Sequence, residues 1–231
     1  MKKHLFILAM LLLVAHAASS QTPYRQFGVK AGVNIASADY VPGTIATPMN
    51  AGAIAGGNFS FTFDRVLLRF ITLGFELNYV NRGYSLPITF TDVNGVPLGQ
   101  TDITYRLNYA AIPLKVGFQF GKKHYFFGNA AIVPAILTKA ISEVKADPSM
   151  GLVGGTSNIY ADAQQYGLSK QVELGAGITP LRNMKFYFSI SKQFAMTNFY
   201  DNSTSQAFNF KPNDLAFNVG MKLEFGKGLL R

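Results

Sequence analysis

The sequence contains no cysteine and no tryptophan, and only 14% of its 231 residues are charged. Without cysteine the chain has no disulfide framework, no thiolate metal site and no acylated cysteine of a lipoprotein. Ordinary soluble domains carry roughly 25% charged residues, whereas this chain is 48% hydrophobic and 13% aromatic. The composition therefore favours a chain in contact with lipid.

Long hydrophobic runs are missing beyond the first twenty residues. The longest uncharged stretch of strong apolar character there is YFFGNAAIVPAILT, which Asn129 and Pro134 interrupt. A membrane helix needs about 18 or more consecutive apolar residues. The chain is thus apolar without helical spans, which favours a β-barrel over a helical bundle.

The N-terminus, MKKHLFILAMLLLVAHAASSQ, has the three parts of an export signal. Lys2 and Lys3 form a basic start, an apolar stretch follows, and Ala15-His16-Ala17 matches the A-x-A cleavage pattern. A buried N-terminal helix is the alternative. The pattern predicts a signal peptide over residues 1–20, cleaved after Ala17 or just before Gln21, and one domain over residues 21–231.

Charge and motifs exclude several partners and cofactors. Without Lys2 and Lys3 the chain has 19 basic and 12 acidic residues, a net charge of +7, which suits anionic lipid headgroups. No Lys/Arg run exists, so nucleic acid is a poor partner. The loop aspartates lack the spacing of a calcium loop, and these are Asp92, Asp102, Asp147, Asp162 and Asp201. We therefore expect no metal and no cofactor.

Apolar and polar residues alternate along most of the remaining chain. In YGLSKQVELGAGI, one parity is apolar except for Lys170, and the other holds small or polar residues. This period of two is typical of β-strands with unlike faces. Eight such strands are expected: 24–37, 50–63, 70–84, 102–120, 125–140, 165–180, 184–196 and 214–226. In the segment 125–140 it is ambiguous which parity is the apolar one.

The expected connections alternate in length. Three are short, 64–69, 121–124 and 181–183, and four are longer, 38–49, 85–101, 141–164 and 197–213. Short periplasmic turns and long outer loops are typical of bacterial outer-membrane barrels. The pattern predicts an all-β, eight-stranded antiparallel up-and-down transmembrane β-barrel in the cell outer membrane, with both termini periplasmic. The 141–164 loop has room for another hairpin, which would make ten strands.

The apolar face is expected to point outward, into lipid. A soluble barrel such as a lipocalin would need many charges on its outer face, but the polar parity is mostly Gly, Ser, Asn and Thr. Small residues suit the crowded interior of an eight-stranded barrel. Gln171 and Glu173 should then face the lumen and Leu174 the lipid. A phase change after Tyr109 predicts a β-bulge near Ala110–Ala111.

Charges in the lumen must be paired, because their desolvation is otherwise costly. The residues assigned to a structural lumen network are Lys30, Glu76, Arg106, Lys115, Glu173, Lys222 and Glu224. Aligning the third and fourth strands predicts a Glu76–Lys115 pair, with Arg106 nearer the outer rim. Lys222 and Glu224 are expected beside Lys30. We expect this network to plug the lumen without leaving a continuous water pore.

Tyrosines near strand ends predict aromatic girdles at the membrane interfaces. The tyrosines in question are Tyr24, Tyr84, Tyr105, Tyr125 and Tyr200. Ordinary strand aromatics are the alternative.

Several segments resemble the PorT-like outer-membrane β-barrel family of Bacteroidetes-type bacteria. They are FGVKAGVN, GFELNYVNRG, LNYAAIPLKVGF, YGLSKQVELGAGI and KFYFSISKQF. The resemblance covers roughly residues 24–226 and implies an outer-membrane barrel, and the member that names the family serves protein secretion. Many such barrels end on an aromatic residue read by the insertion machinery, whereas GKGLLR follows Phe225 here.

Three functions are compatible with such a barrel. The first is a non-enzymatic barrel that acts through extracellular loops or as an accessory of an envelope or secretion complex. The second is a narrow channel for small solutes, and the third is a lipid-modifying enzyme or a protease. His4 and His16 leave with the signal peptide and His124 falls in a periplasmic turn, so the usual imidazole-based catalysis lacks a residue at the outer rim. We expect no catalytic site. The expected partners are outer-membrane lipid, lipopolysaccharide and the barrel-insertion machinery.

Overall fold

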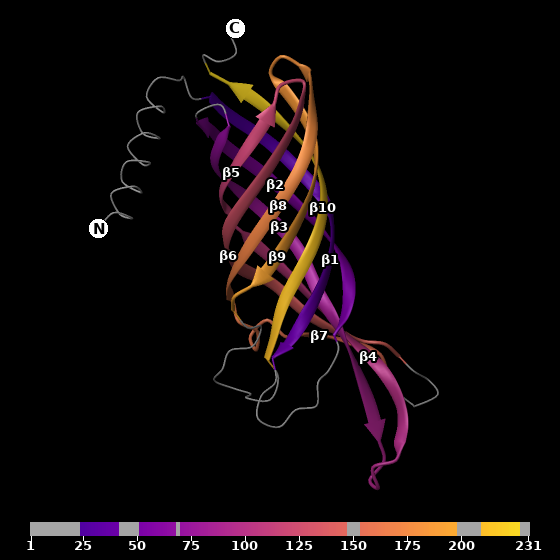
Figure 1. Ribbon diagram of the computed structural model, residues 1–231. Coiled ribbons are helices and arrows are strands. Elements are labelled where there is room, and N and C mark those ends of the chain that lie inside the picture. Colours follow the sequence, from indigo (N-terminus) through magenta and orange to yellow (C-terminus); the bar gives the residue numbers. More distant parts are fainter. Residues whose placement is uncertain (1–23, 42–50, 68–69, 147–152, 198–208, 227–231) are drawn as a thin grey trace, which may run out of the picture.

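A computed structural model describes residues 24–41, 51–67, 70–146, 153–197 and 209–226 (Figure 1). The signal-peptide prediction lies outside the described residues. None of the described residues forms a helix long and apolar enough to cross a membrane.

Ten β-strands make up the described structure. They are β1 (Tyr24–Val41), β2 (Gly52–Leu67), β3 (Ile71–Thr91), β4 (Pro97–Ala111), β5 (Leu114–Gly121), β6 (His124–Val144), β7 (Gly155–Asn158), β8 (Tyr166–Leu181), β9 (Met184–Ala195) and β10 (Asn209–Phe225). All the pairings are antiparallel, and β1 pairs with both β2 and β10, so the sheet closes into a ring.

The wall of the ring contains eight strand positions, which we call staves, although ten strands are assigned. β4 and β5 form one stave, because β3 pairs with both in a single register. The break between them falls at Ile112 and Pro113, where proline lacks a ladder donor. β7 pairs only with the end of β6 and adds no stave. The all-β, eight-stranded antiparallel barrel is therefore confirmed.

The two ends of the ring differ. The start of β1 and the end of β10 lie at one end, together with the β5–β6 and β8–β9 turns (Figure 1). Gly121, which begins the first of these turns, has a φ of 101°, a conformation that favours glycine. The β3–β4 hairpin extends from the other end and projects well beyond the ring (Figure 1). We call these the terminus end and the loop end.

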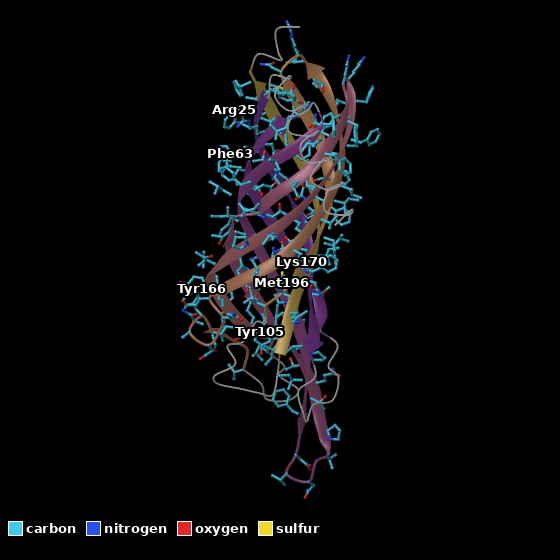
Figure 2. The ribbon with its side chains drawn as sticks, turned by 60° about the vertical axis from the view of Figure 1, so that its left-hand side comes forward. Arg25, Phe63, Tyr105, Tyr166, Lys170 and Met196 are labelled. Atoms are coloured by element: carbon cyan, nitrogen blue, oxygen red, sulfur yellow. The ribbon has the colours of Figure 1, made fainter. Side chains whose placement is uncertain are left out.

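Side-chain direction alternates along every stave, as the period of two predicts. On β8, Gln171 and Glu173 are buried in the lumen and Leu174 is 61% exposed on the outer wall. Phe63, near the terminus end, and Lys170 and Tyr166, nearer the loop end, belong to the outer wall (Figure 2). The predicted placement of Gln171, Glu173 and Leu174 is confirmed.

The bulge predicted near Ala110–Ala111 is wrong. Odd-numbered residues face the lumen on both sides of that point, from Tyr109 through Ala111 to Lys115. The extra residue is in β6 instead, because Asn108 pairs with Lys139 whereas Tyr109 pairs with Leu137. Thr138 is the unpaired residue, and its Oγ1 donates to the carbonyl of Asn108 at 3.0 Å.

The phase change has a different cause: the chemistry of the two faces reverses toward the loop end. Leu107 and Tyr109 are buried inside, while Arg106 is exposed outside. A sheet that rises above the lipid meets water on its outer face, so its apolar residues turn inward as in a soluble protein. The assignment of Arg106 to the lumen is therefore wrong. It pairs on the outer surface with Glu143, at 3.3 Å.

The predicted tyrosine girdles are wrong for at least two of the five residues. Tyr84 and Tyr125 are 0% and 1% exposed and lie in the lumen. Tyr84 stacks on Tyr105 with ring centroids 4.9 Å apart. Tyr24 is half-buried, and Tyr200 lies outside the described residues.

Candidate functional site in the barrel lumen

Lys30 of β1 contacts two buried carboxylates. Its Nζ lies 2.9 Å from Glu76 Oε2 on β3 and 3.1 Å from Glu173 Oε1 on β8. All three side chains are at most 3% exposed. Ser189 Oγ donates to Glu173 at 2.8 Å and Asn129 Nδ2 donates at 3.0 Å, so the carboxylate is fully engaged. Such extra hydrogen bonds are what a buried ion pair needs to offset its desolvation.

The contacts continue across the lumen as a chain of alternating charges. Lys115 Nζ on β5 lies 2.8 Å from Glu76 and 3.0 Å from Asp64 of β2. Asp64 in turn lies 2.8 Å from Lys222 Nζ on β10. We call the six residues the charge chain, in the order Lys222, Asp64, Lys115, Glu76, Lys30 and Glu173. It joins six of the eight staves and carries three positive and three negative groups.

A smaller charge group lies on each side of this chain. Toward the loop end, Arg82 contacts Asp214 and donates to Gln193. Toward the terminus end, Lys185 Nζ lies 2.6 Å from Glu224 Oε1, which also accepts from Gln26 at 2.8 Å. The three groups balance their charges separately, so each height of the lumen is close to neutral.

Aromatic rings fill the space between the lumen charges nearest the terminus end. Lys222 Nζ lies 5.1 Å from the ring centroid of Tyr187 and 5.3 Å from that of Phe127, and Lys185 Nζ lies 4.8 Å from that of Tyr125. These are cation–π distances. The rings occupy room left by glycines: a Cβ on Gly220 would collide with the Tyr187 ring.

These inward rings explain why the parity of 125–140 is ambiguous in the sequence. Tyr125 and Phe127 face the lumen while Phe126 faces outward, so both faces of β6 are aromatic at its start. The sequence alternation that identifies the other staves is absent there.

Apolar residues pack the lumen toward the loop end. The buried cluster comprises Ala38, Val80, Tyr84, Leu86, Leu107, Tyr109, Ala111, Val133, Ala135, Leu137, Ala140 and Ala163. Ala163 belongs to the connection between β7 and β8, and Ile159 and Tyr160 pack against the same cluster. That connection is tied to β6, since Leu137 N donates to the Gln165 carbonyl at 2.7 Å.

Between the charge chain and the apolar cluster lies a polar space of about 20 Å³, lined by groups that include Lys30, Asn78, Arg82, Gln171, Gln193 and Asp214. A space of this size holds about one water molecule. It is too small for a solute.

The structure brings together some of the predicted lumen residues and separates others. Lys30, Glu76, Lys115, Glu173 and Lys222 all belong to the charge chain, with Glu76 and Lys115 in direct contact as the hairpin alignment predicts. Lys222 and Glu224 do not contact Lys30. Lys222 pairs with the carboxylate of Asp64, and Glu224 pairs with the ammonium group of Lys185.

Among the residues that the structure describes, four lumen charges are missing from the predicted network. The expected strand boundaries place Asp64 in a turn, but β2 continues to Leu67 and keeps its carboxylate inside. Arg82, Lys185 and Asp214 face inward as well. All four share the polar parity of their strands. Arg82, Lys185 and Asp214 lie within the expected strands, so applying the parity along their full length would have found them, whereas Asp64 needed an extension of the second strand beyond Phe63.

No group of three His, Cys, Asp or Glu that could hold a metal ion occurs in the part of the chain that the structure describes. His124 is exposed at the first position of β6, at the terminus end.

Comparisons with known proteins give a family and several similar folds. The sequence model of a protein family described as outer membrane protein beta-barrel domain matches residues 17–227. Among solved structures, Neisserial surface protein A is 12% identical with a TM-score of 0.43, over 86% of this chain and 97% of that one. The outer membrane protease OmpT from Escherichia coli is 11% identical with a TM-score of 0.44, over 89% and 97%.

OprG from Pseudomonas aeruginosa is 10% identical with a TM-score of 0.43, over 88% of this chain and 96% of that one. Such weak likenesses carry no inference about function. The comparison with curated proteins finds no match. Because the family model spans the whole ring of strands, the chain belongs to the outer membrane protein beta-barrel domain family.

Proposed function

We propose that the protein is a non-enzymatic barrel with a sealed lumen that acts through its extracellular β3–β4 hairpin. The observation that carries this proposal is the projection of that hairpin beyond the ring (Figure 1). Pairing of β3 with β2 stops at Ser85, and pairing of β4 with β6 stops at Ile103. The segment between them, 86–102, is a two-stranded ribbon whose two outer edges pair with no other strand among the described residues.

The tip of this ribbon is well ordered by its own hydrogen bonds. The Asp92 carboxylate accepts from the backbone N–H groups of Asn94 and Val96, both at 2.8 Å. These bonds hold the pKa of Asp92 below its usual value, because they favour the charged form. Val93 and Val96 are exposed beside it. Free strand edges next to exposed apolar residues are a means of pairing with another protein.

The sealed lumen is supported by two stacked layers. The charge chain crosses the ring from β10 to β8, and the apolar cluster covers it toward the loop end. An ion that crossed the first layer would have to separate buried ion pairs. One that crossed the second would have to enter an apolar core, at a large desolvation cost.

Planar-bilayer recordings test the seal. We expect the purified mature protein to show no large, steady conductance, because neither layer offers a continuous aqueous path. Large and steady single-channel openings from the wild-type protein would reject the plug and favour the second candidate, a narrow channel for small solutes.

Shortening the hairpin tests its role. Joining Leu86 to Ile103 through an Asn-Gly turn removes the ribbon and keeps the cross-strand pair of these two residues. We expect the variant to fold with unchanged heat-dependent gel mobility, and to lose a crosslinked partner that the wild-type protein captures in native envelopes.

The matched control changes charge outside the ribbon, as Lys123→Gln in the terminus-end turn. A partner captured equally by the shortened variant and the wild type would contradict the proposed role of the hairpin. A recurring partner from a secretion complex would favour the accessory role that the PorT-like resemblance implies. A hydrolase or transferase activity abolished by one loop substitution would instead favour an enzyme.

A further inference from the structure

A groove of about 590 Å³ crosses the outer wall of the barrel, from β2 over β3, β4 and β6 to the start of β8. Its lining is largely apolar. Its lining combines the large side chains of Phe61, Leu77 and Tyr166 with the smaller Ala110 and Pro134. This volume lies within the range of small-molecule sites.

The groove lies in the lipid-facing wall and reaches the border of the apolar belt on the side of the loop end. Tyr79, one of its lining residues, pairs across the strands with Ala110. The Tyr79 hydroxyl accepts from Asn108 Nδ2 at 2.8 Å, so polar groups begin directly toward the loop end. Water in such a groove is unfavourable, and the surrounding medium supplies hydrocarbon chains to fill it.

Two lysines interrupt the apolar outer face beside the groove. Lys170 is on β8, where it pairs with Ile132, and the adjacent outward pair toward the loop end is Pro134 with Leu168. Lys192 is on β9, where its cross-strand partner is Val172. Lys170 and Lys192 are therefore diagonal neighbours, with side chains within reach of one another.

Neither of these lysines forms an ion pair among the described residues, in contrast to the lysines of the charge chain. Lys192 Nζ lies 5.7 Å from the ring centroid of Phe194, the next outward residue toward the loop end. The side chain thus points toward the border of the apolar belt on the side of the loop end, as lysines do when they bring an ammonium group to an interface.

We propose that the groove and the two lysines form one binding site for a phosphorylated, multiply acylated glycolipid of the lipid A type. One acyl chain occupies the groove, and a phosphate accepts hydrogen bonds from the ammonium groups of Lys170 and Lys192. Both features lie toward the loop end, which faces the outer leaflet. A phosphate monoester carries close to two negative charges at neutral pH and so matches two lysines, whereas a phospholipid phosphodiester carries one.

Native mass spectrometry of the mature protein in detergent tests the site, with bis-phosphorylated lipid A, dephosphorylated lipid A and phosphatidylglycerol as probes. We expect the wild-type protein to retain one lipid A. Ala110→Phe fills the groove and should weaken binding at least tenfold. Each lysine near an anionic group contributes roughly fivefold in affinity, so Lys170→Gln with Lys192→Gln should weaken lipid A binding roughly 25-fold and leave dephosphorylated lipid A unaffected.

Two controls match these changes. Ala176→Phe adds the same side chain to the outer wall near the terminus end, and Lys123→Gln removes a lysine from the opposite rim. Heat-dependent gel mobility identifies folded variants, and the double lysine variant tests the site independently of groove filling. Equal losses from Ala176→Phe and Ala110→Phe, or equal binding of dephosphorylated lipid A or phosphatidylglycerol to the wild type, would overturn the proposal.

Discussion

Glu76→Gln should lower the free energy of unfolding by about 3–5 kcal/mol, the usual cost of removing one partner of a buried ion pair. Glu76 contacts both Lys30 and Lys115 and is 1% exposed. Without its charge the charge chain holds three lysines and two carboxylates, and the excess positive charge is buried. Urea unfolding in lipid vesicles measures the change.

A double-mutant cycle separates this electrostatic effect from lost packing. Lys115→Gln alone should also destabilise, but combining it with Glu76→Gln leaves two lysines and two carboxylates. The double variant should then lose less stability than the sum of the single variants, because residues in one network couple. Glu143→Gln on the outer surface is the control and should cost below about 1 kcal/mol. A Glu76→Gln variant as stable as this control would show that the chain contributes little to folding.

Leu174→Lys should be the most damaging of the single changes on the outer wall. Leu174 is 61% exposed in the middle of the apolar stretch of β8. A lysine at the midplane of the lipid face costs about 2–4 kcal/mol and near the interface about 0–1 kcal/mol. We expect a destabilisation in the higher range, measured by unfolding in vesicles of defined composition.

Ile178→Lys provides the matched position. Ile178 is an apolar residue exposed on the same face of β8, and it pairs with His124, the first residue of β6 at the terminus end. The lysine there can bring its ammonium group to the interface at smaller cost. If Leu174→Lys and Ile178→Lys were equally stable in vesicles, the outer wall would not lie in hydrocarbon and the orientation of the barrel wall would be wrong.

Pairing between distant staves could not be read from the sequence. Lys30 meets Glu76 and Glu173 although they are 46 and 143 residues away along the chain. These contacts depend on the stagger of the staves around the ring and on how far each side chain reaches across it. The Glu76–Lys115 contact was predictable because one hairpin joins its two strands.

The sequence also did not reveal the level along the barrel at which the apolar face of the strands changes from pointing outward to pointing inward. Leu107 beside Arg106 has the same alternation as Leu174 beside Glu173, with the opposite orientation. Alternation reports that two faces differ, and only the position relative to the lipid decides which face points inward. The bulge at Thr138 escaped detection because both faces of β6 carry apolar residues nearby.

The sequence by itself determined the number of staves, their order and the separation of residues between two faces. These follow from a local period of two and from the lengths of the connections, which neighbouring residues encode. Tertiary structure decided which charges meet, where the lumen becomes apolar and where the outer wall is hollowed. Those features arise only when the ring closes, because closure sets the stagger between staves and hence the neighbours of every side chain.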